Sequence, residues 1–406
     1  MKSFDIPQQF SSSFIDEINE IRNTNDRLKK DFSPSLLSFE NADVLIARHF
    51  GFCYGVKNAV EIAFKVIADN PDKKIYLLSE IIHNPSVNES LLELGVQFIQ
   101  DEKGNQIIEW STINSEDIVI TPAFGTTNEI QEILNSKEVN LKQYDTTCPF
   151  VEKVWKRGNE LASNDATLII HGKTTHEETR ATFSQTSGKR IIVESIEEAK
   201  ELATDIRRED FDDKWKDRVS DGFNFEADFD KIGVINQTTM LAEETHEIAE
   251  LFKNLMIEIH SESQIQQHFV NTRDTLCYAT NDNQSATKAL AKEKLDLTLV
   301  IGGYNSSNTS HLLELFDEGS NIYFIKDEQD LISNKEINHF NLANKSIIGS
   351  SNYIPNKTKL RIGITAGASC PNSTIEEVIK KLLSFKNENV DIQSALSALK
   401  NRINGF

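Results

Sequence analysis

Short apolar segments rich in valine and isoleucine alternate along this chain with polar loops and with longer segments of helical periodicity. The alternation begins near Ala42 and continues to about residue 385. Short continuous apolar runs are typical of strands buried in parallel sheets, which helices connect. The pattern therefore predicts an α/β fold made of small parallel-sheet domains, with strands at 44–47, 118–121, 167–170, 232–235, 297–301 and 362–365.

The two ends and one internal segment depart from this alternation. Residues 1–42 are polar, with an amphipathic pattern over 14–28, and we predict an N-terminal extension. Residues 386–406 are predicted to be a C-terminal tail with a short helix at 392–403. Between them we expect three α/β lobes, at 43–145, 146–273 and 274–385. The second lobe contains dense mixed charge near 204–230, which indicates a solvated insertion.

Composition narrows the class of protein. The chain has 406 residues, of which 38% are hydrophobic, so it can bury a substantial core. Its formal net charge of −20 disfavours nucleic acid as a partner, because Lys and Arg must neutralise phosphates there. A small anion is still compatible with this charge, since a few local donors suffice to bind it.

The sequence also indicates a location. No apolar run approaches the roughly 18 residues that a membrane helix needs, so we expect no membrane span. The first residues include Asp5, Asp16 and Glu17, where a secretory signal would be apolar. The expected location is therefore cytoplasmic.

The four cysteines are the first candidate for chemistry. No CxxC pair occurs, and a reducing compartment disfavours a disulfide framework. Cys53, Cys148 and Cys277 each stand between a strand-like run and a helical pattern, where free N–H groups favour a thiolate. Three thiolates could hold an iron–sulfur cubane with one open iron, but a lone iron or zinc ion could use the same sulfurs. Any one cysteine taken alone is more often a buried packing residue.

Loops rich in small hydrogen-bond donors follow other predicted strands. Ser306, Ser307 and Asn308 lie in one such loop, and Ser369 lies in another. Hydroxyls, carboxamides and helix-start amides suit a phosphate or diphosphate, although ordinary turns and helix caps use the same residues.

Three further strand ends carry candidate groups. His176 and Glu178 could act as an anion ligand and a proton donor, or could belong to a charged surface turn. His83 and Thr238 each follow a strand and are ambiguous when taken alone.

The segments around these cysteines, histidines and polar loops, with others, form a set of eight. In their order along the chain they resemble the motifs of the 4-hydroxy-3-methylbut-2-enyl diphosphate reductase family, also called IspH or LytB. The resemblance runs from about Val44 to Leu383 and is strongest toward the plant and cyanobacterial branch. The segments are Gly-Phe-Cys-Tyr-Gly-Val (51–56), Glu-Ile-Ile-His-Asn-Pro (80–85), Asp-Thr-Thr-Cys-Pro (145–149), His-Glu-Glu-Thr (176–179), Asn-Gln-Thr-Thr (236–239), Cys-Tyr-Ala-Thr (277–280), Asn-Ser-Ser-Asn (305–308) and Thr-Ala-Gly-Ala-Ser (365–369).

The resemblance implies a three-lobed trefoil of α/β domains around a central [4Fe–4S] cluster, with one cluster per chain. Its implied ligands are Cys53, Cys148 and Cys277, and the fourth iron is open to substrate. Cys370 matches no ligand position. The implied reaction is the two-electron reductive dehydroxylation of 4-hydroxy-3-methylbut-2-enyl diphosphate to isopentenyl and dimethylallyl diphosphate, the last step of the non-mevalonate isoprenoid pathway.

The resemblance also implies roles for the polar loops. Glu178 would be the proton source, and Thr238 would act near the substrate alcohol. The implied diphosphate-binding residues are His83, His176, Ser306, Ser307, Asn308 and Ser369. A reduced ferredoxin or flavodoxin is the implied electron donor.

One position departs from the common bacterial pattern. Phe124 stands where that pattern has a third histidine, as it does in the plant and cyanobacterial branch. A phenyl ring cannot bind a diphosphate, so another donor must replace the imidazole. We favour Lys173, with the amides and hydroxyls of Gly125, Thr126 and Thr127 as the alternative.

Two other classes of function are compatible with parts of this pattern. An iron–sulfur sensor or electron-transfer module would need the cysteines but not the Ser-Ser-Asn and Gly-Ala-Ser loops. A zinc-dependent hydrolase could use the same Cys and His residues, and the metal content would distinguish it.

Overall fold

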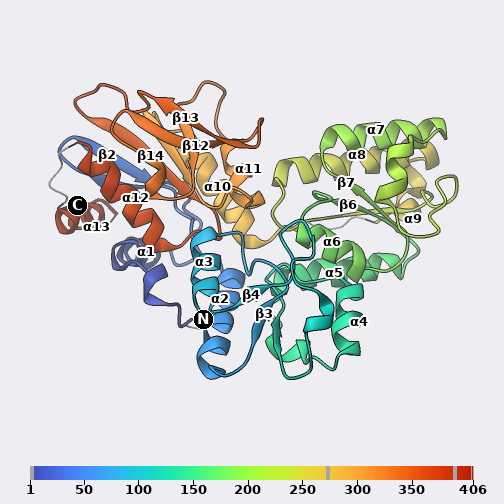
Figure 1. Cartoon of the computed structure of the whole chain (residues 1–406). Coiled ribbons are helices and arrows are strands. Elements are labelled where there is room, and N and C mark those ends of the chain that lie inside the picture. Colours follow the sequence, from blue (N-terminus) through green and yellow to red (C-terminus); the bar gives the residue numbers. More distant parts are fainter. Residues whose placement is uncertain (1–3, 271–274, 387–390, 404, 406) are drawn as a thin grey trace. The chain divides into compact units, whose positions relative to one another are not determined.

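The computed structural model describes residues 4–270, 275–386, 391–403 and 405 (Figure 1). The chain divides into two compact units. Unit 1 comprises Met1–Lys57, His83–Val87 and Tyr278–Phe406, and unit 2 comprises Asn58–Ile82 and Asn88–Cys277. Both units are α/β structures, and together they contain three regions of parallel sheet, as the sequence pattern predicts.

Unit 1 is built on a five-stranded sheet in the order β1-β2-β14-β10-β11. β1 pairs antiparallel with β2, and the other four strands are parallel, apolar and mostly buried. The strands are β1 (Ser35–Ser38), β2 (Ala42–Ile46), β14 (Leu360–Ala366), β10 (Leu297–Ile301) and β11 (Ile322–Ile325). Because β2, β14 and β10 are parallel, the loops that follow them lie at one edge of the sheet, where ligands of α/β proteins bind.

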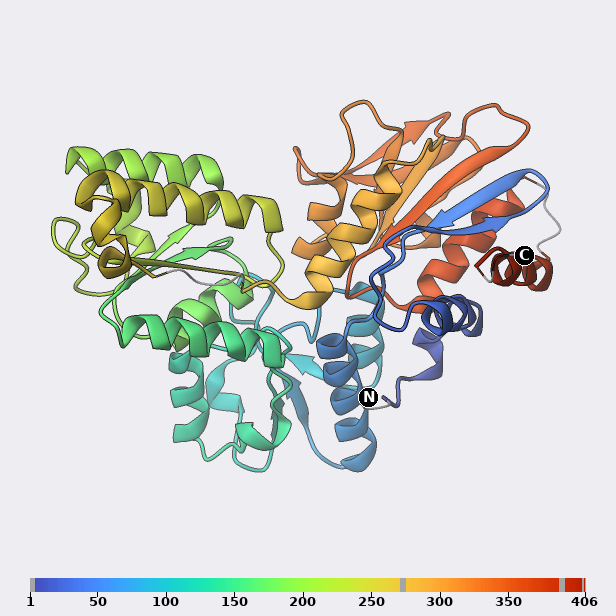
Figure 2. The same ribbon diagram turned by 180° about the vertical axis from the view of Figure 1, so that it is seen from behind.

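Helices and one hairpin complete unit 1 (Figure 2). The helices are η1 (Gln8–Phe10), α1 (Ser13–Asn25), α10 (Tyr278–Ala291), α11 (Ser307–Leu313), η6 (Glu328–Asp330), α12 (Asn372–Ser384) and α13 (Ile392–Ile403). Strands β12 (Glu336–Asn341) and β13 (Ser346–Ser351) pair as an antiparallel hairpin.

Helices α1 and α13 pack into the core of unit 1. Helix α1 begins at a Ser12 cap, whose hydroxyl accepts from the Ile15 N–H at 3.0 Å. The apolar faces of α1 and α13 pack on the same core as β2, β10 and β14, with Ile18 and Leu396 as examples. The helices predicted at 14–28 and 392–403 are therefore confirmed, and both contribute to the hydrophobic core.

Unit 2 contains two parallel sheets, in the orders β4-β3-β5 and β7-β6-β8-β9. Their strands are β3 (Ile75–Leu77), β4 (Gln97–Phe98), β5 (Ile118–Ile120), β6 (Thr167–His171), β7 (Arg190–Val193), β8 (Ile232–Asn236) and β9 (Phe269–Val270). Strands β6 and β8 are buried along their whole length, which matches their continuous apolar sequences.

The helices of unit 2 connect these strands, and α2 and α3 include residues of both units. They are α2 (Tyr54–Asp69), α3 (Pro85–Glu93), η2 (Trp110–Thr112), α4 (Asn128–Ser136), η3 (Leu141–Tyr144), α5 (Pro149–Ala162), α6 (Glu177–Gln185), α7 (Ile196–Arg208), η4 (Asp213–Arg218), α8 (Ala242–His260), η5 (Glu262–Gln264) and α9 (Ile265–His268).

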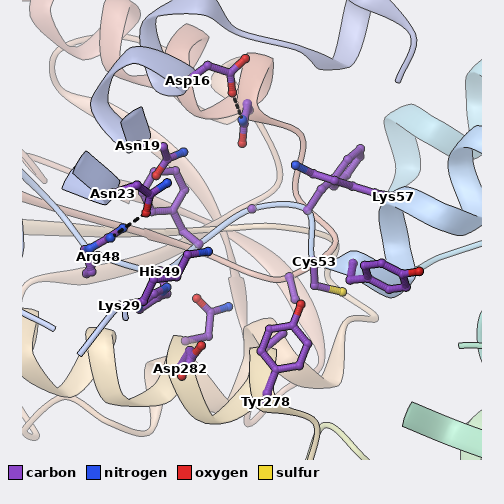
Figure 3. A pocket seen from close by; sticks show the side chains of 18 of the residues that line it. Asp16, Asn19, Asn23, Lys29, Arg48, His49, Cys53, Lys57, Tyr278 and Asp282 are labelled. Atoms are coloured by element: carbon purple, nitrogen blue, oxygen red, sulfur yellow. Dashed lines mark hydrogen bonds between the residues drawn. The ribbon is translucent and has the colours of Figure 1, made fainter. Parts of the chain in front are cut away.

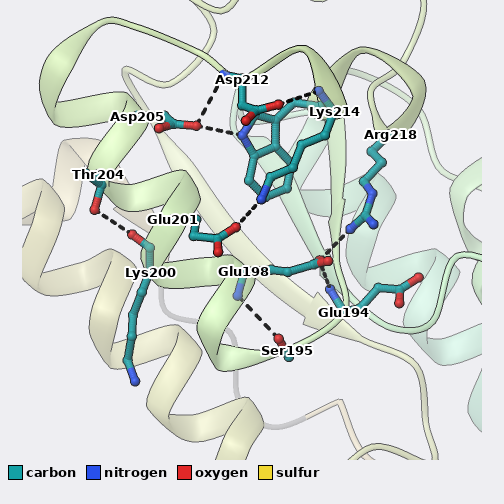
Figure 4. Close-up of polar contacts among 11 residues, drawn as sticks. Glu194, Ser195, Glu198, Lys200, Glu201, Thr204, Asp205, Asp212, Lys214 and Arg218 are labelled. Atoms are coloured by element: carbon teal, nitrogen blue, oxygen red, sulfur yellow. Dashed lines mark hydrogen bonds and ion pairs between the residues drawn. The ribbon is translucent and has the colours of Figure 1, made fainter.

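The charged segment 204–230 is packed more closely than its composition indicates. Trp215 is fully buried in the core of unit 2, and its indole N–H donates to Asp205 at 2.8 Å. Arg218 pairs with Glu198, and Lys214 pairs with Glu201 on α7 (Figure 4). Most charged side chains of the segment are exposed, while Trp215 buries its apolar surface and anchors the segment against α7.

Cys53, Cys148 and Cys277 each stand immediately before a helix, as predicted: α2, α5 and α10 begin at the next residue. Among the described residues, no helix is both long enough and apolar enough to cross a membrane.

Candidate active site

The carboxylate of Glu178 is held by Thr238 inside unit 2. Glu178 lies in the first turn of α6 and is only 1% exposed. Thr238 follows β8, and its backbone N–H donates to Glu178 Oε1 at 2.6 Å while its hydroxyl donates to Oε2 at 2.9 Å. Two donors on one carboxylate satisfy a buried acid and fix its orientation.

His176 is the N-cap residue of the same helix. Its Nδ1 accepts the backbone N–H of Glu178 at 3.1 Å, so in the neutral ring the proton is on Nε2. The ring of Phe124 meets the His176 ring edge to face, with centroids 5.5 Å apart. The imidazole is thus oriented with its Nε2–H as a donor.

Gln237 connects three segments of unit 2 by hydrogen bonds, a role that the sequence did not predict. Its Oε1 accepts the hydroxyl of Thr179 at 3.0 Å and the backbone N–H of Lys173 at 3.2 Å. Its Nε2 donates to Thr239 at 2.6 Å. Gln237 lies inside the Asn-Gln-Thr-Thr segment, and that position was the signal that could have identified it.

Cys148 and Cys277 both belong to unit 2. The Cys277 N–H donates to the Thr238 carbonyl at 3.4 Å, and the Cys148 N–H donates to Ala123 at 3.0 Å. Burial raises the pKa of the Cys148 thiol to about 11, and the neighbouring Cys277 and Glu178 contribute to the rise. A buried thiol of this kind binds metal as a thiolate, so metal binding there must release a proton.

The Ser-Ser-Asn loop of unit 1 leads into α11. Asn308 Oδ1 accepts from the Ala368 N–H at 2.9 Å and from Asn283 Nδ2 at 3.2 Å. Asn308 Nδ2 and Ser307 Oγ are both buried, and neither has a hydrogen-bond partner among the described residues. Buried donors without partners are costly, so this loop is suited to a ligand with acceptor oxygens. Asn283 had no sequence signal, since it lies inside the helical pattern of α10.

Ser306, Ser369 and His83 lie in the same unit. Ser306 caps α11 by accepting from the N–H and hydroxyl of Thr309, at 3.3 and 2.9 Å. The Ser369 hydroxyl donates to the His83 carbonyl at 3.0 Å. A side chain at Gly303 would collide with the same carbonyl, so this close approach requires glycine. Unit 1 thus brings together five of the six predicted diphosphate ligands, His83, Ser306, Ser307, Asn308 and Ser369.

Cys53 is also in unit 1, where its N–H donates to the Ala368 carbonyl at 3.1 Å. The preceding Gly51 has a φ of +73° and is close to Asn372, so glycine is required there. Cys370 is fully buried in the apolar core of unit 1, which agrees with a packing role. Its burial raises the pKa of the thiol.

Lys173 lies in unit 2, in the loop between β6 and α6 that also carries His176. Its backbone is bonded to Gln237, and its side chain is partly exposed. Unit 2 thus contains Glu178, Thr238, His176, Lys173, Cys148 and Cys277.

The chain is an α/β protein in which unit 2 contains a buried acid held by two donors and unit 1 contains buried donors without partners among the described residues, features that are typical of an enzyme for a small anion. The chain belongs to the LytB protein family, whose model matches residues 44–383.

Curated relatives match nearly the whole chain. It is 39% identical over 377 residues to a 4-hydroxy-3-methylbut-2-enyl diphosphate reductase from Microcystis aeruginosa, which covers 92% of this chain and 90% of the relative. It is 40% identical over 358 residues to a protein of the same name from Synechococcus sp., which covers 87% and 88%. The family that the sequence motifs indicated is therefore confirmed.

A solved structure supports the fold. The E-1-hydroxy-2-methyl-but-2-enyl-4-diphosphate reductase from Plasmodium falciparum superposes with a TM-score of 0.61. The match covers 90% of this chain and 99% of that chain, at 22% identity. At this identity the match concerns the fold alone.

Proposed function

We propose that this protein reduces 4-hydroxy-3-methylbut-2-enyl diphosphate to isopentenyl diphosphate and dimethylallyl diphosphate, the last step of the non-mevalonate isoprenoid pathway. The proposal is supported by family membership across residues 44–383 and by relatives of that name with about 40% identity over most of both chains. The reaction takes two electrons and two protons, breaks the allylic C–O bond, forms one C–H bond and releases water.

We propose a [4Fe–4S] cluster with Cys53, Cys148 and Cys277 as its three ligands. The donor set fits such a group, because each thiol stands at a helix start and soft thiolates are the ligands that iron–sulfur clusters use. When bound, the cluster would supply the electrons and an open iron that acts as a Lewis acid.

The observation that carries the proposal is the clamp of Thr238 on Glu178. Hydroxide is a poor leaving group, so the departing oxygen needs a proton from a positioned acid. Glu178 is buried, oriented by two donors and located in a helix first turn. We assign it the delivery of that proton, and we assign Thr238 both the orientation of the carboxyl group and a contact near the substrate alcohol.

The diphosphate needs several donors, and we assign this role to His83, His176, Ser306, Ser307, Asn308 and Ser369. His176 offers its Nε2–H, and the amide of Asn308 and the hydroxyl of Ser307 are buried donors. Charge-assisted hydrogen bonds to phosphate oxygens would hold the substrate in one pose. Lys173 is our candidate for the donor that replaces the family histidine at Phe124.

We propose a reduced ferredoxin or flavodoxin as the electron donor, by family likeness alone. We propose the cytoplasm as the compartment, because thiolate ligands require a reducing environment.

An anaerobic assay tests the proposed function. The purified chain, with an artificial low-potential electron donor, should convert 4-hydroxy-3-methylbut-2-enyl diphosphate to both isomeric products. Iron and sulfide should be present at about four each per chain. A chain with a full cluster that makes neither product would support the sensor or electron-transfer alternative. A chain that contains zinc and hydrolyses its substrate would support the hydrolase alternative.

A further inference from the structure

Unit 1 contains a cavity of about 500 Å³ to which the proposed reaction assigns no ligand (Figure 3). Its walls come from α1, from residues 48–57, from the first turns of α10, and from Ala368 and Asn372. None of the proposed diphosphate ligands is among the residues that line it. The cavity therefore differs from the proposed diphosphate site, although the proposed cluster ligand Cys53 and the Asn308 partner Asn283 line it.

Three cationic side chains line this cavity, namely Lys29, Arg48 and Lys57. Within the described parts of the chain, none of the three forms a salt bridge with a carboxylate. This is unexpected in a chain with 63 acidic and 43 basic residues, where a carboxylate partner is abundant. The cavity therefore gathers three cationic side chains without an ion-pair partner among the described residues of an acidic protein, although Asp26, Asp31 and Asp282 act on Arg48 without pairing with it.

Arg48 gives the strongest evidence for an anion site, because this cationic residue is only 3% exposed. Its Nη2 donates to the neutral carboxamide of Asn23 at 2.9 Å, and its Nε has no partner among the residues that the structure describes. Burial lowers the pKa of Arg48, and the neighbouring Arg22 lowers it further. A buried guanidinium with a neutral partner and an unused donor is costly until an anion compensates it.

His49, next to Arg48 in the sequence, also lines the cavity. Its Nε2 is buried and also lacks a hydrogen-bond partner in the described chain. Burial and the charges of Arg48 and Lys29 lower the pKa of His49 to about 4. An anion near these groups would oppose the effect of both charges, and protonated Nε2 would then become a donor.

Two acids also line the cavity, against three cationic side chains. Asp16 accepts the side-chain amide of Asn372 at 3.0 Å, on the wall of the cavity. Burial raises the pKa of Asp282, whereas the charges of Lys29 and Arg48 act to lower it, so this carboxyl group offsets part of the positive charge. Aromatic side chains line the remaining wall, including Phe50, Phe52 and Tyr278.

We propose that this cavity binds a small organic phosphate. Its phosphate group would lie against Lys29, Arg48 and Lys57, and its apolar body against the aromatic wall. The cavity has the size and the mixture of apolar surface with a few convergent polar groups that small-molecule sites show.

The site is linked by backbone to the proposed diphosphate site. Cys53 and Ala368 line the cavity, and the Cys53 N–H donates to the Ala368 carbonyl. The N–H of the same Ala368 donates to Asn308 Oδ1. A ligand in the cavity would therefore contact the backbone that orients Asn308.

Equilibrium dialysis with inorganic diphosphate tests the number of sites on the intact, anaerobically purified chain. We expect two sites in the wild type. Lys29→Gln with Lys57→Gln should weaken one site at least tenfold, and Ser307→Ala with Asn308→Ala should weaken the other. Arg27→Gln with Lys30→Gln removes the same charge from exposed positions outside the cavity and should leave both sites intact.

The inference does not rest on the proposed function, because Lys29, Arg48 and Lys57 have no part in that function and the measurement needs no turnover. A single site in the wild type that only the Ser307 and Asn308 changes weaken would overturn it. Equal weakening by the control pair would also overturn it, since the effect would then be general electrostatics.

Two local measurements complete the test. Inorganic diphosphate should protect Lys29 and Lys57, but not Lys30, from an amine-acylating reagent, as followed by mass spectrometry. Phenyl phosphate should bind the cavity at least tenfold more tightly than inorganic phosphate, because its ring adds apolar burial. Equal affinities would contradict an organic ligand, and unprotected lysines would contradict the location.

Discussion

Thr238 binds both carboxylate oxygens of Glu178, through its backbone N–H at 2.6 Å and its hydroxyl at 2.9 Å. The carbonyl of the same residue accepts the N–H of Cys277 at 3.4 Å. Thr238, in the loop after β8, therefore orients the proposed acid and also binds the backbone of the proposed cluster ligand Cys277.

This relationship predicts the effect of Thr238→Val, which removes the hydroxyl and keeps the backbone N–H and the shape. The hydroxyl orients the carboxyl group for proton delivery, so its loss should lower kcat roughly tenfold or more. Steady-state kinetics at several substrate concentrations would measure it. Thr238→Ser restores the hydroxyl and should recover most of the turnover. Wild-type kcat in the valine variant would show that the clamp is not needed for the reaction.

The ligand assignment predicts that three of the four cysteines are needed for the cluster and that Cys370 is not. Serine at position 53, 148 or 277 should remove or severely degrade the cluster, because a site with three thiolates has no spare ligand. Cys370→Ser is the matched control, since Cys370 is buried in the apolar core of unit 1. Iron and sulfide analysis with the visible absorption spectrum would measure the outcome. Loss of iron in the Cys370 variant together with a full cluster in one of the others would contradict the ligand assignment.

Substitutions at Phe124 and Lys173 should have opposite effects on substrate binding. Lys173→Ala should raise KM about tenfold while iron content is unchanged, because a charge-assisted contact to the diphosphate is lost. Adding Phe124→His to that variant should recover part of the affinity by returning an imidazole. Lys156→Ala, at an exposed position on α5, is the control for a general loss of charge. An unchanged KM in Lys173→Ala would favour the loop amides of Gly125, Thr126 and Thr127.

His49 predicts how stability depends on pH. Its pKa is about 4 in the folded chain, below its ordinary value of 6.5, chiefly because of burial. Below pH 6.5 the unfolded chain takes up a proton that the folded chain does not. The stability due to neutral His49 is therefore complete above pH 6.5 and is lost as pH falls toward 4.

Urea unfolding between pH 7.5 and 4 would measure this contribution. One pKa unit corresponds to about 1.4 kcal/mol, and partial exposure of the ring reduces the total, so we expect a loss of about 1–2 kcal/mol. His49→Gln should lose less stability over this range than the wild type, whereas His246→Gln, at an exposed position, should behave like the wild type. Parallel profiles for the wild type and His49→Gln would contradict the assignment.

Local sequence patterns predicted the six strands β2, β5, β6, β8, β10 and β14 and the position of each predicted cluster cysteine before a helix, because continuous apolar runs and helix starts are encoded by neighbouring residues. Contacts between segments that are distant in the sequence could not be predicted from such local patterns. The antiparallel pairing of β1 with β2 and the burial of Trp215 depend on the whole fold. Asn283 could not be identified from the sequence, because its role is to orient Asn308 from another helix.

The most direct test of the proposed mechanism is a single-turnover measurement on Glu178→Gln. This variant keeps the shape of the side chain but has no carboxyl proton to deliver. Cluster content and substrate affinity should be those of the wild type, while formation of both products should slow by about 10²-fold or more. Glu177→Gln, at the neighbouring buried position, is the control and should have a much smaller effect. Wild-type product formation in Glu178→Gln would contradict the account, because the proton would then come from another group.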